Sequence, residues 1–266
     1  MPEILNSIGR DILMVEDHPR VEELSEFQAE LLISNKTPLK LYQDLLVGKN
    51  SIFELLKYEL ICVYCSQIPG ALGILLRKKL YRHVFKKMGK NVILGKIVVR
   101  HPSKIELGNN VVIDDYSTLD ANGKNNKGIH LEDNVMIGRN TFIHGQGYFE
   151  MGFNSKVNMN CIIQAEKLVK IGRNVSIGAF SYLIGQGKYN YDRFDIPLLA
   201  QKGRSKDGIV IEDDVIIGTG VKILEGVKIG TGSIIGANAV VTKDIPPYSI
   251  AAGIPATVIK KRRLDR

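Results

Sequence analysis

IEDDVI, IGTGVK, ILEGVK, IGTGSI, IGANAV and VTKDIP are consecutive six-residue segments that begin at Ile211 and end at Pro246. The first position of each segment is aliphatic: Ile211, Ile217, Ile223, Ile229, Ile235 and Val241. A period of six fits neither a 3.6-residue helix nor a simple hairpin sheet. It is typical of a parallel β-helix, in which each segment forms a short strand and a turn and points one aliphatic side chain inward. Three segments close one triangular coil, and coils stack about 4.8 Å apart.

The same register extends towards the N-terminus as triplets of aliphatic residues. Within each triplet, neighbouring aliphatic residues are six positions apart. These anchors are Leu107, Ile113, Leu119; Leu131, Ile137, Ile143; Met151, Val157, Ile163; and Ile171, Ile177, Leu183. Because the spacing is larger only between triplets, every insertion enters at one edge of the prism. We predict six full coils, with a less regular start around Met88–Val99, and a long loop at residues 185–207 extruded from that edge. A rigid prism that presents such a loop is a scaffold for function.

The 266-residue chain therefore divides into a helical region, 1–88, and a β-helix domain, 89–266, with the loop and a C-terminal tail. Within the first region the patterns predict helices over four ranges: Val21–Ser34, Leu39–Val47, Ile52–Ser66 and Ala71–Met88. None has the uninterrupted apolar length of a spanning helix. Three cysteines and no secretory signal favour a cytoplasmic protein.

The formal net charge of +8 is concentrated in residues 77–90 and in the tail Lys260–Arg263. Such basic clusters suit a phosphorylated cofactor, an anionic lipid or a nucleic acid. No recognition helix or aromatic platform accompanies them, so we do not expect nucleic acid. Two interpretations of residues 52–88 stay open. One is a helical hairpin packed on the β-helix or on a neighbouring subunit. The other is a peripheral membrane contact with the basic side on anionic headgroups, which would place the protein beside a lipid-linked acceptor.

The closing stretch VVTKDIPPYSIAAGIPATVIKKR (Val240–Arg262), the hexapeptide run and the long loop together resemble the left-handed β-helix acyltransferases. This hexapeptide-repeat family includes sugar O-acetyltransferases and xenobiotic acetyltransferases, and the resemblance covers roughly Gly89–Arg263. The repeat is shared with gamma-type carbonic anhydrases and nucleotidyltransferase tails, whereas TKDIPP and AxGxPA are more specific. The resemblance implies a left-handed coil, a homotrimer, and acetyl-CoA or another acyl-CoA in the cleft between adjacent prisms.

The resemblance also implies a set of cofactor-binding residues. The pantetheine channel would be lined by Gly218, Thr219, Gly236 and Ala237, and the CoA phosphates would meet Thr242, Lys243 and Lys260. Flat glycine and alanine surfaces let a thin arm lie against backbone donors, and lysine supplies charge for phosphate.

Acyl transfer to a hydroxyl needs a general base with a pKa near neutrality. In related enzymes this base is a histidine in the long loop, but residues 185–207 contain none. Tyr189 stands approximately where the histidine belongs, and a phenol with a pKa near 10 is a poor base. His144 follows the anchor Ile143 and so lies on the insertion edge, as does Glu166. We therefore take His144 as the candidate base, oriented by Glu166. No metal is expected, because no second and third histidine share this edge.

The sequence thus indicates an acyl-CoA-dependent acyltransferase. The acceptor would be a hydroxyl or amine of a sugar, a lipid-linked glycan or a small natural product. The alternative is a non-catalytic hexapeptide-repeat protein that binds acyl-CoA or acts as a scaffold, because the usual loop histidine is absent.

Overall fold

The computed structural model describes residues 36–123, 126–185, 190, 192–196, 201 and 207–262. Residues Leu39–Gln186 and Ser205–Arg266 form one compact unit. A second unit comprises Met1–Pro38 and Gly187–Arg204, and in it the Arg193 guanidinium pairs with the Asp195 carboxylate. The predicted helix Val21–Ser34 and most of the predicted loop 185–207 lie outside the described residues.

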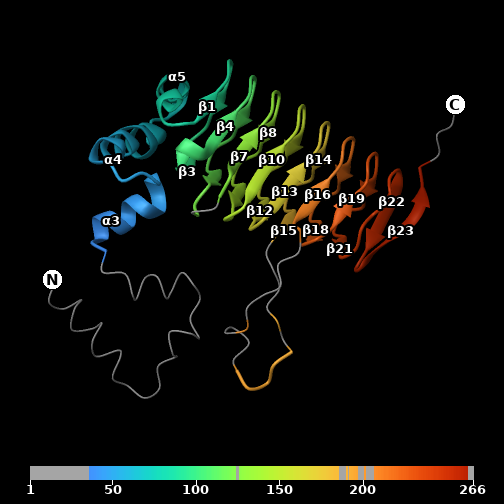
Figure 1. Cartoon of the computed structure of the whole chain (residues 1–266). Helices are drawn as coiled ribbons and strands as arrows, with labels where there is room; N and C mark the ends of the chain where they lie inside the picture. Colours follow the sequence, from blue (N-terminus) through green and yellow to red (C-terminus); the bar gives the residue numbers. More distant parts are fainter. Residues whose placement is uncertain are drawn as a thin grey trace. The chain divides into compact units, whose positions relative to one another are not determined.

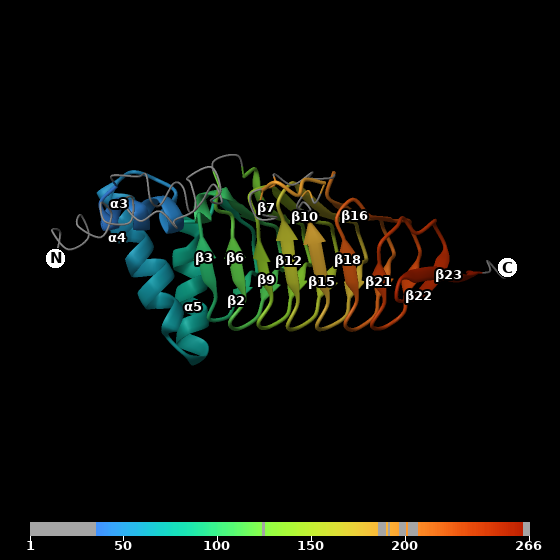
Figure 2. The same cartoon turned by 90° about the horizontal axis from the view of Figure 1, so that it is seen from below.

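The first unit is a parallel β-solenoid built from three sheets (Figures 1 and 2). The first sheet contains β1 (Lys87–Met88), β4 (Ile105–Leu107), β7 (Gly128–Leu131), β10 (Tyr148–Met151), β13 (Leu168–Ile171), β16 (Ile209–Ile211) and β19 (Lys228–Ile229). The second contains β2 (Ile93–Leu94), β5 (Val112–Ile113), β8 (Met136–Ile137), β11 (Lys156–Val157), β14 (Ser176–Ile177), β17 (Ile216–Ile217), β20 (Ile234–Ile235), β22 (Ser249–Gly253) and β23 (Ala256–Lys261). The third contains β3 (Val98–Arg100), β6 (Thr118–Asp120), β9 (Phe142–His144), β12 (Ile162–Ala165), β15 (Tyr182–Gly185), β18 (Lys222–Leu224) and β21 (Val240–Val241). The mainly β, parallel solenoid predicted from the hexapeptide period is confirmed.

The solenoid has seven turns, one more than the six full coils that the sequence predicts. The extra turn is the stretch around Met88–Val99, whose strands β1, β2 and β3 pair in parallel with those of the next coil. Its anchors Leu94 and Val99 are five residues apart instead of six, and this shorter spacing hid the coil. The helix predicted to run to Met88 is wrong at its end, because Lys87–Met88 is already a strand.

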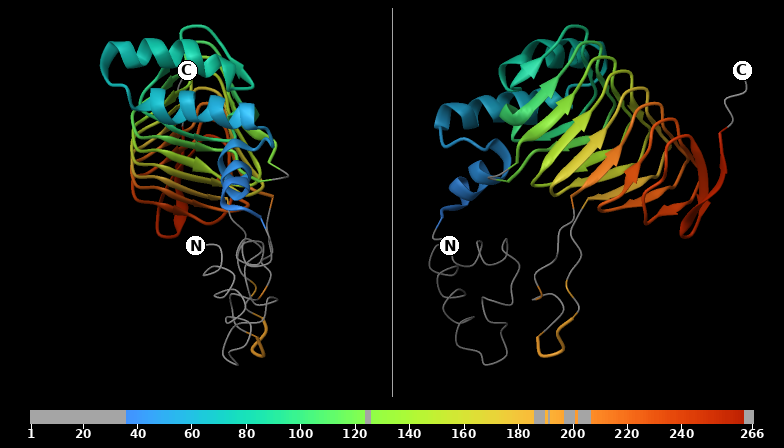
Figure 3. Two further views of the ribbon diagram at one scale, coloured as in Figure 1. Left: turned by 90° about the vertical axis from the view of Figure 1, so that its left-hand side faces the viewer. Right: turned by 45° about the vertical axis from the view of Figure 1, so that its right-hand side comes forward.

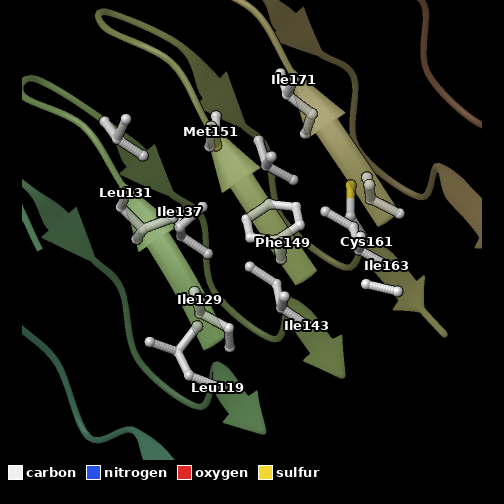
Figure 4. Close-up of a cluster of buried hydrophobic side chains, with 14 of the residues drawn as sticks. Leu119, Ile129, Leu131, Ile137, Ile143, Phe149, Met151, Cys161, Ile163 and Ile171 are labelled. Atoms are coloured by element: carbon white, nitrogen blue, oxygen red, sulfur yellow. The ribbon is translucent and has the colours of Figure 1, made fainter. Parts of the chain in front are cut away.

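The predicted anchors stack in columns along the solenoid and form its core (Figure 4). Leu131, for example, pairs with Leu107 in the preceding coil and with Met151 in the following one. All eighteen predicted anchors are at most 2% exposed. One inward aliphatic side chain per segment therefore explains both the period and the core.

Asparagines form a second column at the turn between the first and second sheets. Asn110, Asn134, Asn154 and Asn174 all have a positive φ, which asparagine tolerates better than most residues. Their side chains bond from coil to coil: Asn110 Nδ2 donates to Asn134 Oδ1 at 2.9 Å, and Asn154 Nδ2 donates to Asn174 Oδ1 at 2.9 Å. These bonds tie successive turns together along the edge.

The short helical region lies across the first coil (Figure 1). Its elements are α3 (Pro38–Tyr42), η3 (Gln43–Val47), α4 (Ile52–Tyr58), η4 (Glu59–Tyr64), η5 (Cys65–Gln67), α5 (Gly70–Leu80) and η6 (Tyr81–His83), and a further turn η7 (Pro102–Lys104) follows β3. The Tyr58 hydroxyl donates to the Val99 carbonyl at 2.7 Å, and the buried Arg77 Nε donates to the Leu94 carbonyl at 2.8 Å. These bonds to β-strand carbonyls attach the helices to the solenoid.

Candidate active site

His144 is the last residue of β9, on the edge where the third sheet turns back to the first. We call this the insertion edge, because the connecting residues 121–123, 126–127, 145–147 and 166–167 lie on it. The His144 side chain is half-buried, and its ring lies against that of Phe142, with centroids 4.5 Å apart. Gly145 follows at φ 144°, where a Cβ would stand 2.3 Å from the Ala165 backbone. The turn after His144 thus packs directly on the next coil.

Asp120 occupies the position of His144 in the preceding coil, and Gln164 occupies it in the following one. Asp120 is 8% exposed, and Arg100 donates to its carboxylate at 3.2 Å. Asp120 was not predicted from the sequence, because the candidate positions next to His144 were sought only in the following coils. Asp120 follows the anchor Leu119 directly, as His144 follows Ile143, so the same register would have found it.

The environment of His144 favours the neutral imidazole. Burial lowers the pKa of His144 below its usual value of about 6.5, and the charges of Glu166 and Asp120 oppose this shift without cancelling it. Glu166 lies at the turn between β12 and β13, on the same edge. A neutral imidazole flanked by two carboxylates can accept a proton and have the resulting charge stabilised.

Tyr189, the other predicted catalytic residue, lies outside the described residues. The neighbours of His144 that the structure describes therefore all come from the solenoid. There, Asp120, Asn126 and Gly145 line a narrow recess together with His144.

The predicted pantetheine-binding residues stand together on a different edge, which joins the second sheet to the third. Gly218 and Thr219 follow β17, and Gly236 and Ala237 follow β20 one coil later. A Cβ on Gly218 would lie 2.6 Å from the Ala237 nitrogen, so close stacking of the coils is by itself a reason for glycine there. We call these four residues the glycine edge.

The predicted phosphate-binding residues lie near the end of the solenoid. Thr242 and Lys243 follow β21, which places them on the insertion edge, and Lys243 is exposed. Lys260 is exposed on β23, where it pairs with Ile250 of β22. Four coils separate Lys243 from His144, a distance of roughly 19 Å at one strand spacing per coil.

A single chain does not bring the glycine edge to His144, because the two edges lie at opposite ends of the third-sheet strands. A larger hollow, about 410 Å³, lies on neither edge but over the first sheet and the turns that follow its strands. Its lining includes Glu106 and His130, whose side chains approach to 3.7 Å. Within the described ranges, no cluster of three or more histidine, cysteine or acidic side chains could hold a metal ion.

Comparisons with known proteins agree with this architecture. A model of the bacterial transferase hexapeptide (six repeats) family matches residues 208–243, the stretch with which the sequence analysis began, so the predicted resemblance to hexapeptide-repeat transferases is confirmed there. A comparison with curated proteins found no match.

Among solved structures, a mutant of AntD, an N-acyltransferase from Bacillus cereus in complex with dTDP and coenzyme A, is 21% identical, with a TM-score of 0.50. The alignment covers 71% of this chain and 90% of AntD, and at this identity it shows the fold. AntD with dTDP and 3-hydroxybutyryl-CoA is 25% identical, covering 70% and 88%, with a TM-score of 0.48. The hexapeptide-repeat acetyltransferase VCA0836 from Vibrio cholerae is 22% identical, covering 80% and 94%, with a TM-score of 0.39.

Proposed function

We propose that the protein is an acyl-CoA-dependent acyltransferase that transfers an acyl group, in the first instance acetyl, to a hydroxyl or amine of a sugar, a lipid-linked glycan or a small natural product. The observation that carries the proposal is the half-buried imidazole of His144 on the insertion edge, next to Asp120 of the preceding coil. His144 would remove the acceptor proton as the acceptor attacks the thioester carbonyl, and the CoA thiolate would leave. Asp120 and Glu166 would stabilise the imidazolium that forms.

The cofactor would lie along the prism axis, between one chain and its neighbour. A nucleotide held near Lys243 and Lys260 and a thioester near His144 are separated by roughly 19 Å along the axis. The pyrophosphate and extended pantetheine arm of CoA together can span such a distance. The glycine edge of the adjacent chain would supply the flat second wall, which the same chain cannot provide.

We expect a homotrimer, because this cleft needs a second chain. Bulky apolar side chains exposed on the second and third sheets and on the edge between them support such a contact: Ile93, Tyr116, Met136, Ile162, Phe180 and Ile216. Sedimentation equilibrium at micromolar concentration should give three times the 29.6 kDa chain mass. A species of one chain mass would contradict the shared-cleft arrangement.

Lys243→Ala should weaken CoA binding by roughly 1–3 kcal/mol, since a charge-assisted contact with phosphate would be lost. Binding of pantetheine, which lacks the nucleotide phosphates, should hardly change. Calorimetric titration of both ligands measures the difference. Lys170→Ala removes another exposed lysine, on the outer face of β13 in the first sheet, away from the proposed subunit contact, and should leave both affinities unchanged. Equal losses for CoA and pantetheine in Lys243→Ala would remove Lys243 from the phosphate site.

The pH dependence of kcat/KM should follow the titration of His144. The base is active when neutral, and burial lowers its pKa, so activity should be full at neutral pH and fall on acidification. The midpoint of this acidic limb should lie below about 6.5, the ordinary value for histidine. A limb with a midpoint clearly above that value would assign the titration to another group.

The test of the function itself is release of free thiol from acetyl-CoA in the presence of amino sugars, sugars and lipid-linked glycans. Acceptor-dependent release supports the transferase. The missing loop histidine favours one alternative, an acyl-CoA-binding protein without catalysis. Tight acetyl-CoA binding with no thiol release for any acceptor class would favour that alternative.

A further inference from the structure

The α4–η4 segment is apolar on two opposite faces, although it lies at the surface. Its inner face packs on the first coil through Leu55, Tyr58 and Ile61, all at most 6% exposed. Its outer face carries a second stripe at helical spacing of three to four residues, formed by Phe53, Leu56, Leu60 and Tyr64, which are 62–69% exposed. Packing on the solenoid explains only the inner stripe.

The following helix, α5, also carries apolar side chains on its exposed side, although its inner side is polar. Gly73 and Arg77 face inward, and Arg77 donates to the carbonyls of Ser66, Ile68 and Leu94. Leu72 and Leu75 face outward, and each is 63% exposed. Because the inner faces of α4–η4 and α5 both meet the first coil, their outer faces point away from the solenoid (Figure 3). We call the outward side chains Phe53, Leu56, Leu60, Tyr64, Leu72 and Leu75 the end face.

The chain around the end face is basic. Between Glu59 and Glu106 the sequence contains no acidic residue, but ten lysines and arginines, of which Arg77 is buried and Lys86 and Arg100 pair with Glu106 and Asp120. Lys79 near the end of α5 and Arg82 in η6 are exposed, and among the ion pairs of the described residues neither pairs with an acidic side chain. The nearby acid Glu54 is bonded to both Lys49 and Lys57, at 3.4 Å and 2.8 Å. The border of the end face is therefore positively charged.

We propose that the end face docks the protein on a bilayer that contains anionic lipids. Bulky apolar side chains flanked by lysine and arginine match the two layers of such a surface, acyl chains below and negative headgroups above. No described helix has the length and hydropathy needed to cross a membrane, so the contact is with one leaflet. Large exposed apolar patches of this kind mark interaction sites.

This inference deepens the proposed function by naming where the acceptor is met. If the protein is an acyltransferase, docking by the end face brings the prism to a lipid-linked or headgroup-borne acceptor. The docking itself follows from the end face and does not depend on catalysis.

The experiment is co-sedimentation of the full chain with vesicles of phosphatidylcholine, with and without added phosphatidylglycerol. The wild type should bind the mixed vesicles and leave the neutral ones largely unbound. Leu56→Ser with Leu60→Ser should weaken binding to the mixed vesicles by roughly tenfold or more, because apolar area that would enter the bilayer is removed. Lys79→Glu with Arg82→Glu should remove the preference for anionic vesicles. Phe153→Ser changes a phenylalanine that is 42% exposed on the turn after β10, away from the end face and from the proposed subunit contact, and should bind like the wild type.

Equal, weak binding of all variants to both vesicle types would overturn the proposal. A change of oligomeric state in Leu56→Ser with Leu60→Ser, without vesicles, would also overturn it, by assigning the end face to contact between copies. Acetyl-CoA affinity should be the same in wild type and variants. Failure of docking with acetyl-CoA binding intact would therefore leave the acyltransferase proposal standing.

Discussion

His144→Ala is expected to lower the turnover of acyl transfer to a hydroxyl by roughly 10²–10⁴-fold, the usual contribution of a positioned general base. The reason is the arrangement on the insertion edge, where burial lowers the pKa of the His144 imidazole and the charges of Asp120 and Glu166 act on it. Acetyl-CoA affinity should be unchanged, because the residues proposed to bind the CoA phosphates stand four coils away. Steady-state rates and calorimetric binding measured on the same preparation separate the two effects.

His130→Ala is the matched control, because His130 is also partly exposed on a strand but faces outward from the first sheet next to Glu106. It should retain the wild-type rate. Asp120→Asn should fall between the two, since it keeps the shape of the side chain but removes a charge that stabilises the imidazolium. Full activity of His144→Ala with a hydroxyl acceptor would remove His144 from the mechanism.

An amine acceptor changes this expectation in a specific way. An amine that is partly unprotonated can attack a thioester with proximity supplying much of the acceleration. A sugar hydroxyl has a far higher pKa and needs the base. The size of the His144→Ala effect with each acceptor class therefore reports which class the protein uses.

Ile217→Ala is expected to destabilise the solenoid by about 2–5 kcal/mol, the cost of removing a large buried aliphatic side chain. Ile217 is 2% exposed and is stacked between Ile177 and Ile235 in the neighbouring coils. In a repeat protein each coil is stabilised mainly by its neighbours, so a cavity in one coil weakens two interfaces. Urea unfolding followed by circular dichroism should show a lower midpoint.

Val210→Ala provides an internal comparison, because Val210 is an aliphatic residue on the outward face of β16, in the same coil as Ile217. Val210 is only partly buried and lies on the first sheet, outside the proposed subunit contact, so the change should cost no more than about 1 kcal/mol. Equal losses for the two variants would contradict the inward and outward alternation on which the register depends.

The solenoid could be predicted from the sequence because the positions of individual aliphatic residues show the period of six. Within each coil, from Leu107 to Val241, the aliphatic anchors are six residues apart, and the structure stacks the anchors of successive coils on one another. The first coil was not predicted as a full coil, because Leu94 and Val99 are five residues apart instead of six. The asparagine column was not predicted, because the prediction used only the aliphatic positions of the repeat and not the polar residues of its turns.

The candidate site was only partly predictable. His144 directly follows Ile143, the third anchor of its coil, so its place on the insertion edge could be predicted from the sequence. The role of Asp120 depends on a lateral contact between coils twenty-four residues apart, which appears only when the coils are stacked. The candidate cofactor-binding residues were predicted from a resemblance, and the edges on which they lie in one chain do not meet, so the proposed cleft needs a second chain.

The most direct test of the acyltransferase account is a crystal structure of the protein with acetyl-CoA bound. We predict that the nucleotide phosphates contact Lys243 and Lys260. The pantetheine arm should run between two chains along the glycine edge of one of them. The thioester should end beside His144, leaving room for one acceptor group between the carbonyl carbon and the imidazole. Acetyl-CoA bound with its thioester at the opposite end of the solenoid from His144, or not bound at all, would contradict it.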